Sequence, residues 1–149
     1  MVDFRQVKTA PSFKVRIADW AADINRLRSV REAVFVLEQS VPVELEWDEF
    51  DAVSTHVLAE SDGLAIGTGR LLPDGHIGRM AVLKPWRGIG VGNAMLATLV
   101  ELARARGYSS LRLNAQEHAI AFYQRQGFIA EGDIFDEAGI PHRRMVRDV

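Results

Sequence analysis

The chain has 149 residues, of which 48% are hydrophobic and 26% charged, and 18 basic against 20 acidic side chains give it a net charge of -2. This length and composition predict one globular domain with a substantial core, and they exclude a disordered or fibrous protein. Because there is no cysteine, disulfide frameworks, cysteine zinc fingers and thiol nucleophiles are excluded as well.

The charge and hydropathy patterns also limit the partners that the chain can have. Its basic residues form no cluster of the kind that binds nucleic acid. No run approaches the ~20 apolar residues that cross a bilayer, and the N-terminus has no apolar stretch of signal-peptide length. We therefore expect a cytoplasmic protein without nucleic-acid or membrane partners. Residues 1–12 carry little pattern and are expected to be a flexible lead within a single domain spanning 1–149.

The first third of the chain predicts a strand and a long helix. Residues 13–17 alternate apolar and basic side chains, as a half-buried strand does. Asp19 is a typical N-cap residue for a helix over residues 20–38. The apolar residues of that helix recur every three or four positions, at Ile24, Leu27, Val30, Val34 and Leu37. The acidic segment that follows, VELEWDEFDA, is expected to be a loop or a short helix.

The rest of the chain predicts strands and two more helices. Turn signals at 61–63 and 73–75 separate three apolar runs, which indicates an antiparallel meander. The later elements are expected to be a helix over 90–106, a strand over 109–115, a helix over 117–126, and two strands over 128–135 and 142–149. The order β-α-β-β-β-α-β-α-β-β predicts an α/β fold, with a mixed sheet and helices on its faces.

The segment Arg87-Gly88-Ile89-Gly90-Val91-Gly92 carries the clearest chemical signal. It joins a predicted strand directly to a predicted helix. Free N–H groups at such a helix start suit a phosphate, and glycines let an anion approach the backbone closely. Arg87 can add a two-pronged contact to the same anion. The same glycines would also serve a simple tight turn.

Two other phosphate-binding motifs do not fit this segment. Asn93 stands where a dinucleotide-binding fingerprint needs its third glycine, and no Gly-Lys-Ser/Thr follows as a P-loop requires. A nucleotide-binding protein is therefore the weakest of the readings for this loop. None of the four histidines has the spacing of a metal site, so no metal is expected.

The segment Arg87-x-x-Gly90-x-Gly92 resembles the pyrophosphate loop of the GNAT acetyltransferases. A second stretch, AIAFYQRQGF over residues 119–128, is similar to the segment of that family that carries its conserved tyrosine. The stretches VREAVFVLEQSVP, LNAQEHAIAFYQRQGF and DEAGIPHRRM further resemble the ElaA-like branch. This resemblance implies the GNAT fold, whose mixed, mostly antiparallel sheet is splayed between its fourth and fifth strands.

The resemblance also implies acetyl-CoA as cosubstrate and assigns residues to it. The pantetheine arm would lie between the splayed strands and bond the backbone of Met80, Ala81 and Val82. The pyrophosphate loop would comprise Arg87, Gly88, Ile89, Gly90, Val91, Gly92 and Asn93. Gln116 stands where many relatives have an asparagine that touches the cofactor arm.

Two catalytic roles follow from the same resemblance. Tyr123 matches the family's general acid, which protonates the leaving thiolate, although it can also be a core tyrosine. Many relatives use a glutamate on the fifth strand as base, but Asn114 stands there and cannot titrate. Glu38 is our preferred base, while His118, His142, the acidic segment 44–51 and water remain open.

The sequence thus predicts an acetyl-CoA-dependent N-acetyltransferase that acts on a primary amine of a small molecule or peptide by direct attack. A non-catalytic CoA-binding module is the alternative, supported by Asn114. Five carboxylates beside Trp47 and Phe50 could bind a cationic acceptor, or could form a solvated face. The acceptor, the preferred acyl length and the formation of a homodimer are left open.

Overall fold

The computed structural model describes residues 12–149. The strands are β1 (Lys14–Ala18), β2 (Thr55–Ser61), β3 (Leu64–Leu71), β4 (His76–Val82), β5 (Ser110–Gln116), β6 (Ile129–Glu137) and β7 (Ile140–Asp148). The longer helices are α1 (Trp20–Arg31), η2 (Glu32–Glu38), α2 (Val43–Glu46), α3 (Val91–Ala105) and α4 (Ile120–Arg125). Short 3-10 turns lie at η3 (Asp51–Val53), η4 (Lys84–Trp86) and η5 (Glu117–Ala119). The predicted order of strands and helices is confirmed. The expected flexible lead falls, apart from Ser12, outside the described residues.

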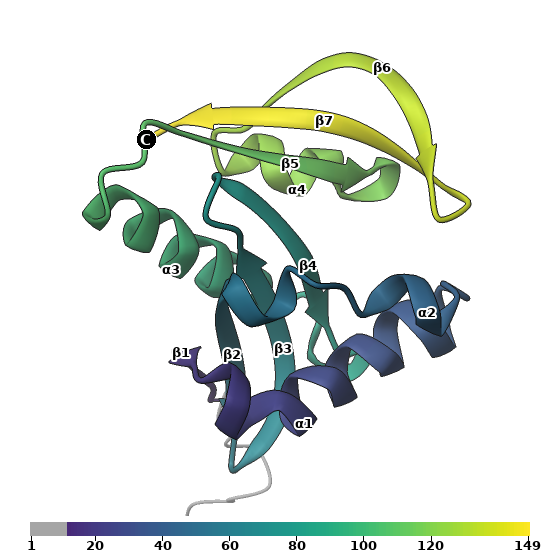
Figure 1. The fold of residues 1–149 in the computed structure, drawn as a ribbon, viewed down its shortest axis with the longest axis vertical. Helices are drawn as coiled ribbons and strands as arrows, with labels where there is room; N and C mark the ends of the chain where they lie inside the picture. The colour runs from purple at the N-terminus through teal and green to yellow at the C-terminus, as the bar shows by residue number, and fades with distance from the viewer. Residues whose placement is uncertain (1–11) are drawn as a thin grey trace, which may run out of the picture.

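The strands form one mixed sheet in the order β1-β2-β3-β4-β5-β7-β6. Every neighbouring pair is antiparallel except β4 and β5, which are parallel. Figure 1 shows that β5 and β7 run across the direction of β2, β3 and β4, so the sheet turns sharply between its two halves. The predicted α/β class and mixed, mostly antiparallel sheet are confirmed.

The first helix begins as predicted but changes form halfway. The carboxylate of Asp19 accepts hydrogen bonds from the backbone of Ala21 and Ala22 and caps α1. From Glu32 the chain continues as a π-helix, η2, in which each turn takes up more residues than an α-helical turn. The prediction of one regular amphipathic helix over 20–38 is therefore wrong in its second half. Leu37, expected on the buried face, is 72% exposed.

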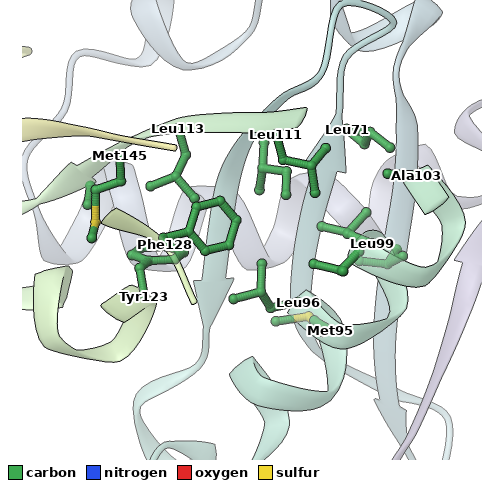
Figure 2. Close-up of a cluster of buried hydrophobic side chains, with 14 of the residues drawn as sticks. Leu71, Met95, Leu96, Leu99, Ala103, Leu111, Leu113, Tyr123, Phe128 and Met145 are labelled. Carbon is green, nitrogen blue, oxygen red and sulfur yellow. The ribbon is translucent and has the colours of Figure 1, made fainter. Parts of the chain in front are cut away.

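Two apolar clusters hold helices on the two faces of the sheet. The larger one packs α3 and α4 against inward side chains of the sheet, and Figure 2 shows ten of its members by name, including Leu99, Leu113 and Phe128. The smaller one joins α1 and η2 to the other face through Leu58 and Ala81. These two clusters fix the helices that flank the split in the sheet.

The last hairpin closes the fold with an arched strand. β6 pairs with β7 near both of its ends, but the register shifts between Glu131 and Phe135. Figure 1 shows β6 bowing away from β7 along this stretch.

None of the helices between Ser12 and Val149 combines the length and apolar character that a bilayer crossing requires.

Candidate functional site

The sheet opens between β4 and β5. Their parallel pairing is confined to two positions, His76 with Arg112 and Ile77 with Leu113. Beyond this point β4 continues to Val82 while its other edge stays paired with β3. Among the strands of residues 12–149, none pairs with this edge of the last part of β4, and a ligand with amide groups can bond to it in the manner of an added strand.

A bulge in β4 accompanies this opening. Gly69 of β3 faces two residues of β4, Arg79 and Met80, because the register shifts between Thr68 and Arg70. Arg79 has a φ of 50°, in the left-handed region that non-glycine residues rarely adopt. A bulge bends its strand and increases the local twist, so it helps β4 diverge from β5.

The glycine segment lies directly after the open strand. Gly88 and Gly90 have φ values of 80° and 95°, which other L-residues adopt only with strain. Gly90 is the N-cap of α3 and provides no side-chain cap. Within residues 12–149, no acceptor receives the N–H groups of Gly88 to Asn93, and open space lies above Gly88 and Gly90. This helix start therefore has the free N–H groups and the open space that an anion would need.

Arg87 and Glu38, predicted for different roles, contact each other. Both terminal nitrogens of Arg87 donate to Glu38, each N–O distance being 2.7 Å, while its Nε donates to the carbonyl of Val82 at 2.9 Å. The Arg87 guanidinium lowers the pKa of the Glu38 carboxyl, with further small contributions from Lys84 and His118. In this arrangement Glu38 is a weaker base than an ordinary glutamate.

Tyr123 lies in the apolar core on helix α4. Its side chain belongs to the larger apolar cluster and is 8% exposed, next to Phe128 in Figure 2. Phe122 and Phe128 both meet its ring edge-on, at centroid distances of 5.0 and 5.9 Å. Burial raises the pKa of the Tyr123 phenol well above its usual range, so the hydroxyl keeps its proton at any physiological pH.

Gln116 ends β5 and is tied to the far side of the split. Its side-chain amide exchanges two hydrogen bonds with the amide of Gln39, at 3.1 and 2.8 Å. Gln39 directly follows Glu38, the last residue of η2. Glu38 contacts Arg87, which follows β4, and Gln39 contacts Gln116, which ends β5. These two consecutive residues therefore contact both sides of the split. Sequence reasoning missed Gln39, because only the π-helix brings it to this place.

The other proposed bases have different surroundings. Asn114 donates a long bond of 3.4 Å to Glu137. His142 is buried, with Nδ1 2.6 Å from the carbonyl of Ile140 and Nε2 3.4 Å from a carboxylate oxygen of Glu137. It lies opposite Gln116 on β7. His118 lies on η5, close enough to Glu38 to influence its pKa.

The acidic segment is largely neutralised inside the protein. Its ion pairs join Arg31 to Glu46 and Asp51 (2.8 and 2.7 Å), Arg70 to Asp48 and Asp51 (2.7 and 2.8 Å), and Arg79 to Glu46 and Asp48 (3.3 and 3.1 Å). Arg31 is completely buried and also lies 4.8 Å from the centre of the Trp47 ring. The expectation of five carboxylates facing an acceptor is thus corrected, since only Glu44 and Glu49 are exposed.

This ionic cluster connects the segment after η2 to the open strand. Arg79, at the bulge, also donates to the backbone carbonyls of Leu45 and Glu46, at 3.4 and 3.3 Å. Sequence reasoning missed this link, because a run of acidic residues gives no sign of which arginines it will meet. Within the described residues, no three acidic or histidine side chains gather so as to hold a metal ion.

Comparisons with known sequences agree with this architecture. The sequence model of the acetyltransferase (GNAT) domain matches residues 23–149. The uncharacterized N-acetyltransferase YjcF of Bacillus subtilis is 40% identical over 124 residues, which cover 80% of this chain and 88% of YjcF. The protein ElaA of Escherichia coli is 31% identical over 131 residues, which cover 83% of this chain and 86% of ElaA.

Comparisons with solved structures give the same result. The crystal structure of Escherichia coli ElaA superposes with a TM-score of 0.82, over 91% of this chain and 99% of ElaA, at 28% identity. An acyl-CoA N-acyltransferase from Pseudomonas aeruginosa superposes with a TM-score of 0.81 at 31% identity, over 91% of this chain and 99% of that one.

Proposed function

The chain belongs to the GNAT acetyltransferase family, in its ElaA-like branch, and from this membership we propose that it transfers an acetyl group from acetyl-CoA to a primary amine of a small molecule or peptide. The bound acetyl-CoA supplies an acetyl group activated as a thioester. In the transfer, the amine nitrogen bonds the acetyl carbon, the carbon–sulfur bond breaks, and CoA leaves as the thiol.

One observation carries this proposal: the free edge of β4 leads directly into the glycine segment. The backbone of Met80, Ala81 and Val82 can bond the amides of a pantetheine arm, and one N–H can polarise the thioester carbonyl. The N–H groups of residues 88–93 can receive the pyrophosphate at the start of α3. Gln116 lies on the opposite side of the split and can contact the arm. The open space above Gly88 and Gly90 fits such a ligand.

The proton transfers are assigned to Tyr123 and Glu38. We propose that Tyr123 donates its phenolic proton to the departing sulfur, a role supported by its position in the segment that matches the one carrying the family's general acid. We propose Glu38 as the group that accepts a proton from the amine, although Arg87 now holds both of its oxygens. His118, His142 and water are the other candidates.

A non-catalytic CoA-binding module is the second candidate function. It is favoured by Asn114, which stands on β5 where many relatives have a titratable glutamate and which bonds only weakly to Glu137. Both functions use the same loop, so cofactor binding does not separate them. For either, we propose a cytoplasmic location, where acetyl-CoA is available.

Two measurements test the proposal in sequence. Calorimetry with acetyl-CoA, using NAD and ATP as controls, should show micromolar binding of acetyl-CoA alone. A panel of primary amines, including tyramine, putrescine, glucosamine and a lysine-containing peptide, should then release CoA thiol in the presence of the protein. Binding without turnover of any amine would favour the binding module, and absence of acetyl-CoA binding would refute both functions.

A further inference from the structure

The contact between Arg87 and Glu38 joins segments 49 residues apart in the sequence. It is bidentate, with each terminal nitrogen of Arg87 facing one oxygen of Glu38. The third donor, Nε, points to the carbonyl of Val82. The paired edge of the guanidinium is thus fully engaged by Glu38, and the rest of the group is anchored to the end of β4.

A carboxylate and a phosphate bind the guanidinium of an arginine in the same way. Both present two oxygens at a spacing that matches the two terminal nitrogens of a guanidinium. That edge of Arg87 can serve one such group at a time. Because Arg87 is the first residue of the pyrophosphate loop, Glu38 occupies the position at which a phosphate of the cosubstrate would meet this side chain.

The surroundings of Glu38 favour a negative charge in general. Besides Arg87, Lys84 and His118 also lie close enough to lower the pKa of its carboxyl. The two paired side chains are 39% and 38% exposed, so water and salt weaken their attraction, and such pairs contribute little net stability. A ligand with more negative charge than one carboxylate can therefore displace Glu38 at modest cost.

From this geometry, and resting on the proposed function, we propose that Glu38 is an intramolecular competitor for Arg87 that the diphosphate of CoA displaces. Glu38 is then a specificity-determining residue, because a ligand gains the Arg87 contact only if its charge outcompetes the carboxylate. Carriers that contain a diphosphate should displace Glu38, and pantetheine without phosphate should not contact Arg87 at all.

The displacement would also link binding of the cosubstrate at Arg87 to proton transfer from the amine to Glu38. While it is bound to Arg87, the Glu38 carboxylate has both oxygens occupied by hydrogen bonds. Once a phosphate has taken the guanidinium, those oxygens are free to accept a proton from an amine. Binding of the cosubstrate before the amine follows from this order of events.

Calorimetry at fixed pH and salt, with four probes, tests the competition. The probes are acetyl-CoA, 3′-dephospho-CoA, 4′-phosphopantetheine and pantetheine, and the proteins are wild type, Glu38→Gln and Glu32→Gln. Glu32 lies on η2 as well and is exposed, so its variant removes the same charge from the same element. We expect Glu38→Gln to bind the two diphosphates about 3- to 10-fold more tightly than wild type, with a smaller gain at high salt.

The controls make the result specific to Arg87. Pantetheine affinity should be the same in all three proteins, and Glu32→Gln should match wild type with every probe. In the background of Arg87→Met, the additional change Glu38→Gln should produce much less gain, because the competition has no target. Thermal unfolding of each variant will verify that it is folded.

Three results would overturn the inference. One is an unchanged or weaker affinity of Glu38→Gln for the diphosphates, which would show that Glu38 positions Arg87 instead of competing with the ligand. Another is an equal gain for pantetheine, which would place the effect elsewhere. The third, failure of wild type and Glu38→Gln to bind any probe, would refute the proposed function together with the inference.

Discussion

The side chain of Met80 lies directly over Gly69 on the neighbouring strand, so close that a β-carbon on Gly69 would overlap the Met80 sulfur. Met80 follows the bulge residue Arg79 and belongs to the free edge of β4. The absence of a side chain on Gly69 therefore leaves the space that the Met80 side chain occupies.

Replacing Gly69 by alanine should push Met80 out of this position. We expect a loss of about 1–2 kcal/mol in the free energy of unfolding and a clear loss of acetyl-CoA affinity, because the open edge of β4 must shift. Chemical denaturation and calorimetry measure the two effects. Gly78→Ala is the control, since a β-carbon there meets nothing within 4 Å. Equal behaviour of the two variants would contradict the role given to Gly69.

Replacing Gly90 by glutamate should abolish most acetyl-CoA binding. The new side chain adds strain at a φ of 95° and places a carboxylate where the pyrophosphate is proposed to bind. Gly63→Glu introduces the same residue at a left-handed glycine in the turn between β2 and β3, away from the loop. We expect both to lose about 1–2 kcal/mol of stability, but only Gly90→Glu to lose at least about tenfold in affinity. An affinity of Gly90→Glu equal to that of Gly63→Glu would make the loop purely structural.

Replacing Tyr123 by phenylalanine should separate catalysis from binding. The ring keeps its edge-on contacts with Phe122 and Phe128, so folding and acetyl-CoA affinity should hardly change. Loss of the proton donor should lower kcat by about 100-fold with any amine that the wild type accepts. Tyr108→Phe, a partly buried tyrosine at the other end of the core, should leave kcat unchanged. A wild-type kcat in Tyr123→Phe would mean that this tyrosine is only a core residue.

Replacing Arg31 by methionine should unfold the segment that holds Arg79. Its guanidinium is completely buried and contacts Glu46 and Asp51, so the substitution removes one of the two arginine partners of each buried carboxylate. We expect a loss of about 3–5 kcal/mol in unfolding free energy. Arg28→Met, at an exposed arginine that also lies over Trp47, should cost less than about 1 kcal/mol. Similar losses in the two variants would refute a structural role for the ionic cluster.

The ion pair between Arg16 and Asp23 should make stability depend on acid. Hydrogen bonds from Arg16 lower the pKa of Asp23 from 3.8 to about 2. A folded-state pKa below the unfolded one adds stability above about pH 4, which is lost as the pH falls toward 2. Because Arg16 is 42% exposed, we expect Asp23→Asn to cost only about 1–2 kcal/mol at pH 7. In unfolding curves, the gap between variant and wild type should narrow below pH 4, and a constant gap would contradict this assignment.

The order of strands and helices could be predicted because local patterns carry it. Alternation, helical spacing and glycine-containing turns are properties of neighbouring residues, and they placed the elements that form the split sheet. The glycine segment was equally visible, since its conformation depends on residues without a side chain. The resemblance to a family added what local patterns do not contain, namely the splay between β4 and β5.

The features that were missed depend on contacts between distant residues. The π-helix keeps the apolar spacing of an α-helix at first, so nothing local distinguishes Val34 from Leu37, yet only Val34 is buried. The left-handed backbone of Arg79 has no signature in an arginine, because it belongs to a shift in the pairing of β4 with β3. The pairing of Glu38 with Arg87 joins residues 49 positions apart in the sequence, and sequence reasoning assigned the two residues to separate roles.

The arch of β6 affects how the protein behaves at high concentration. β6 is the last strand of the sheet, and a straight edge strand can template the strands of other molecules into aggregates. Between Glu131 and Phe135, however, β6 leaves the register of β7, with Gly132 at a φ of 75°. A strand approaching this edge would find aligned hydrogen-bonding groups only near the two ends of β6. The bow of β6 thus hinders the growth of fibrils along this one of the two sheet edges.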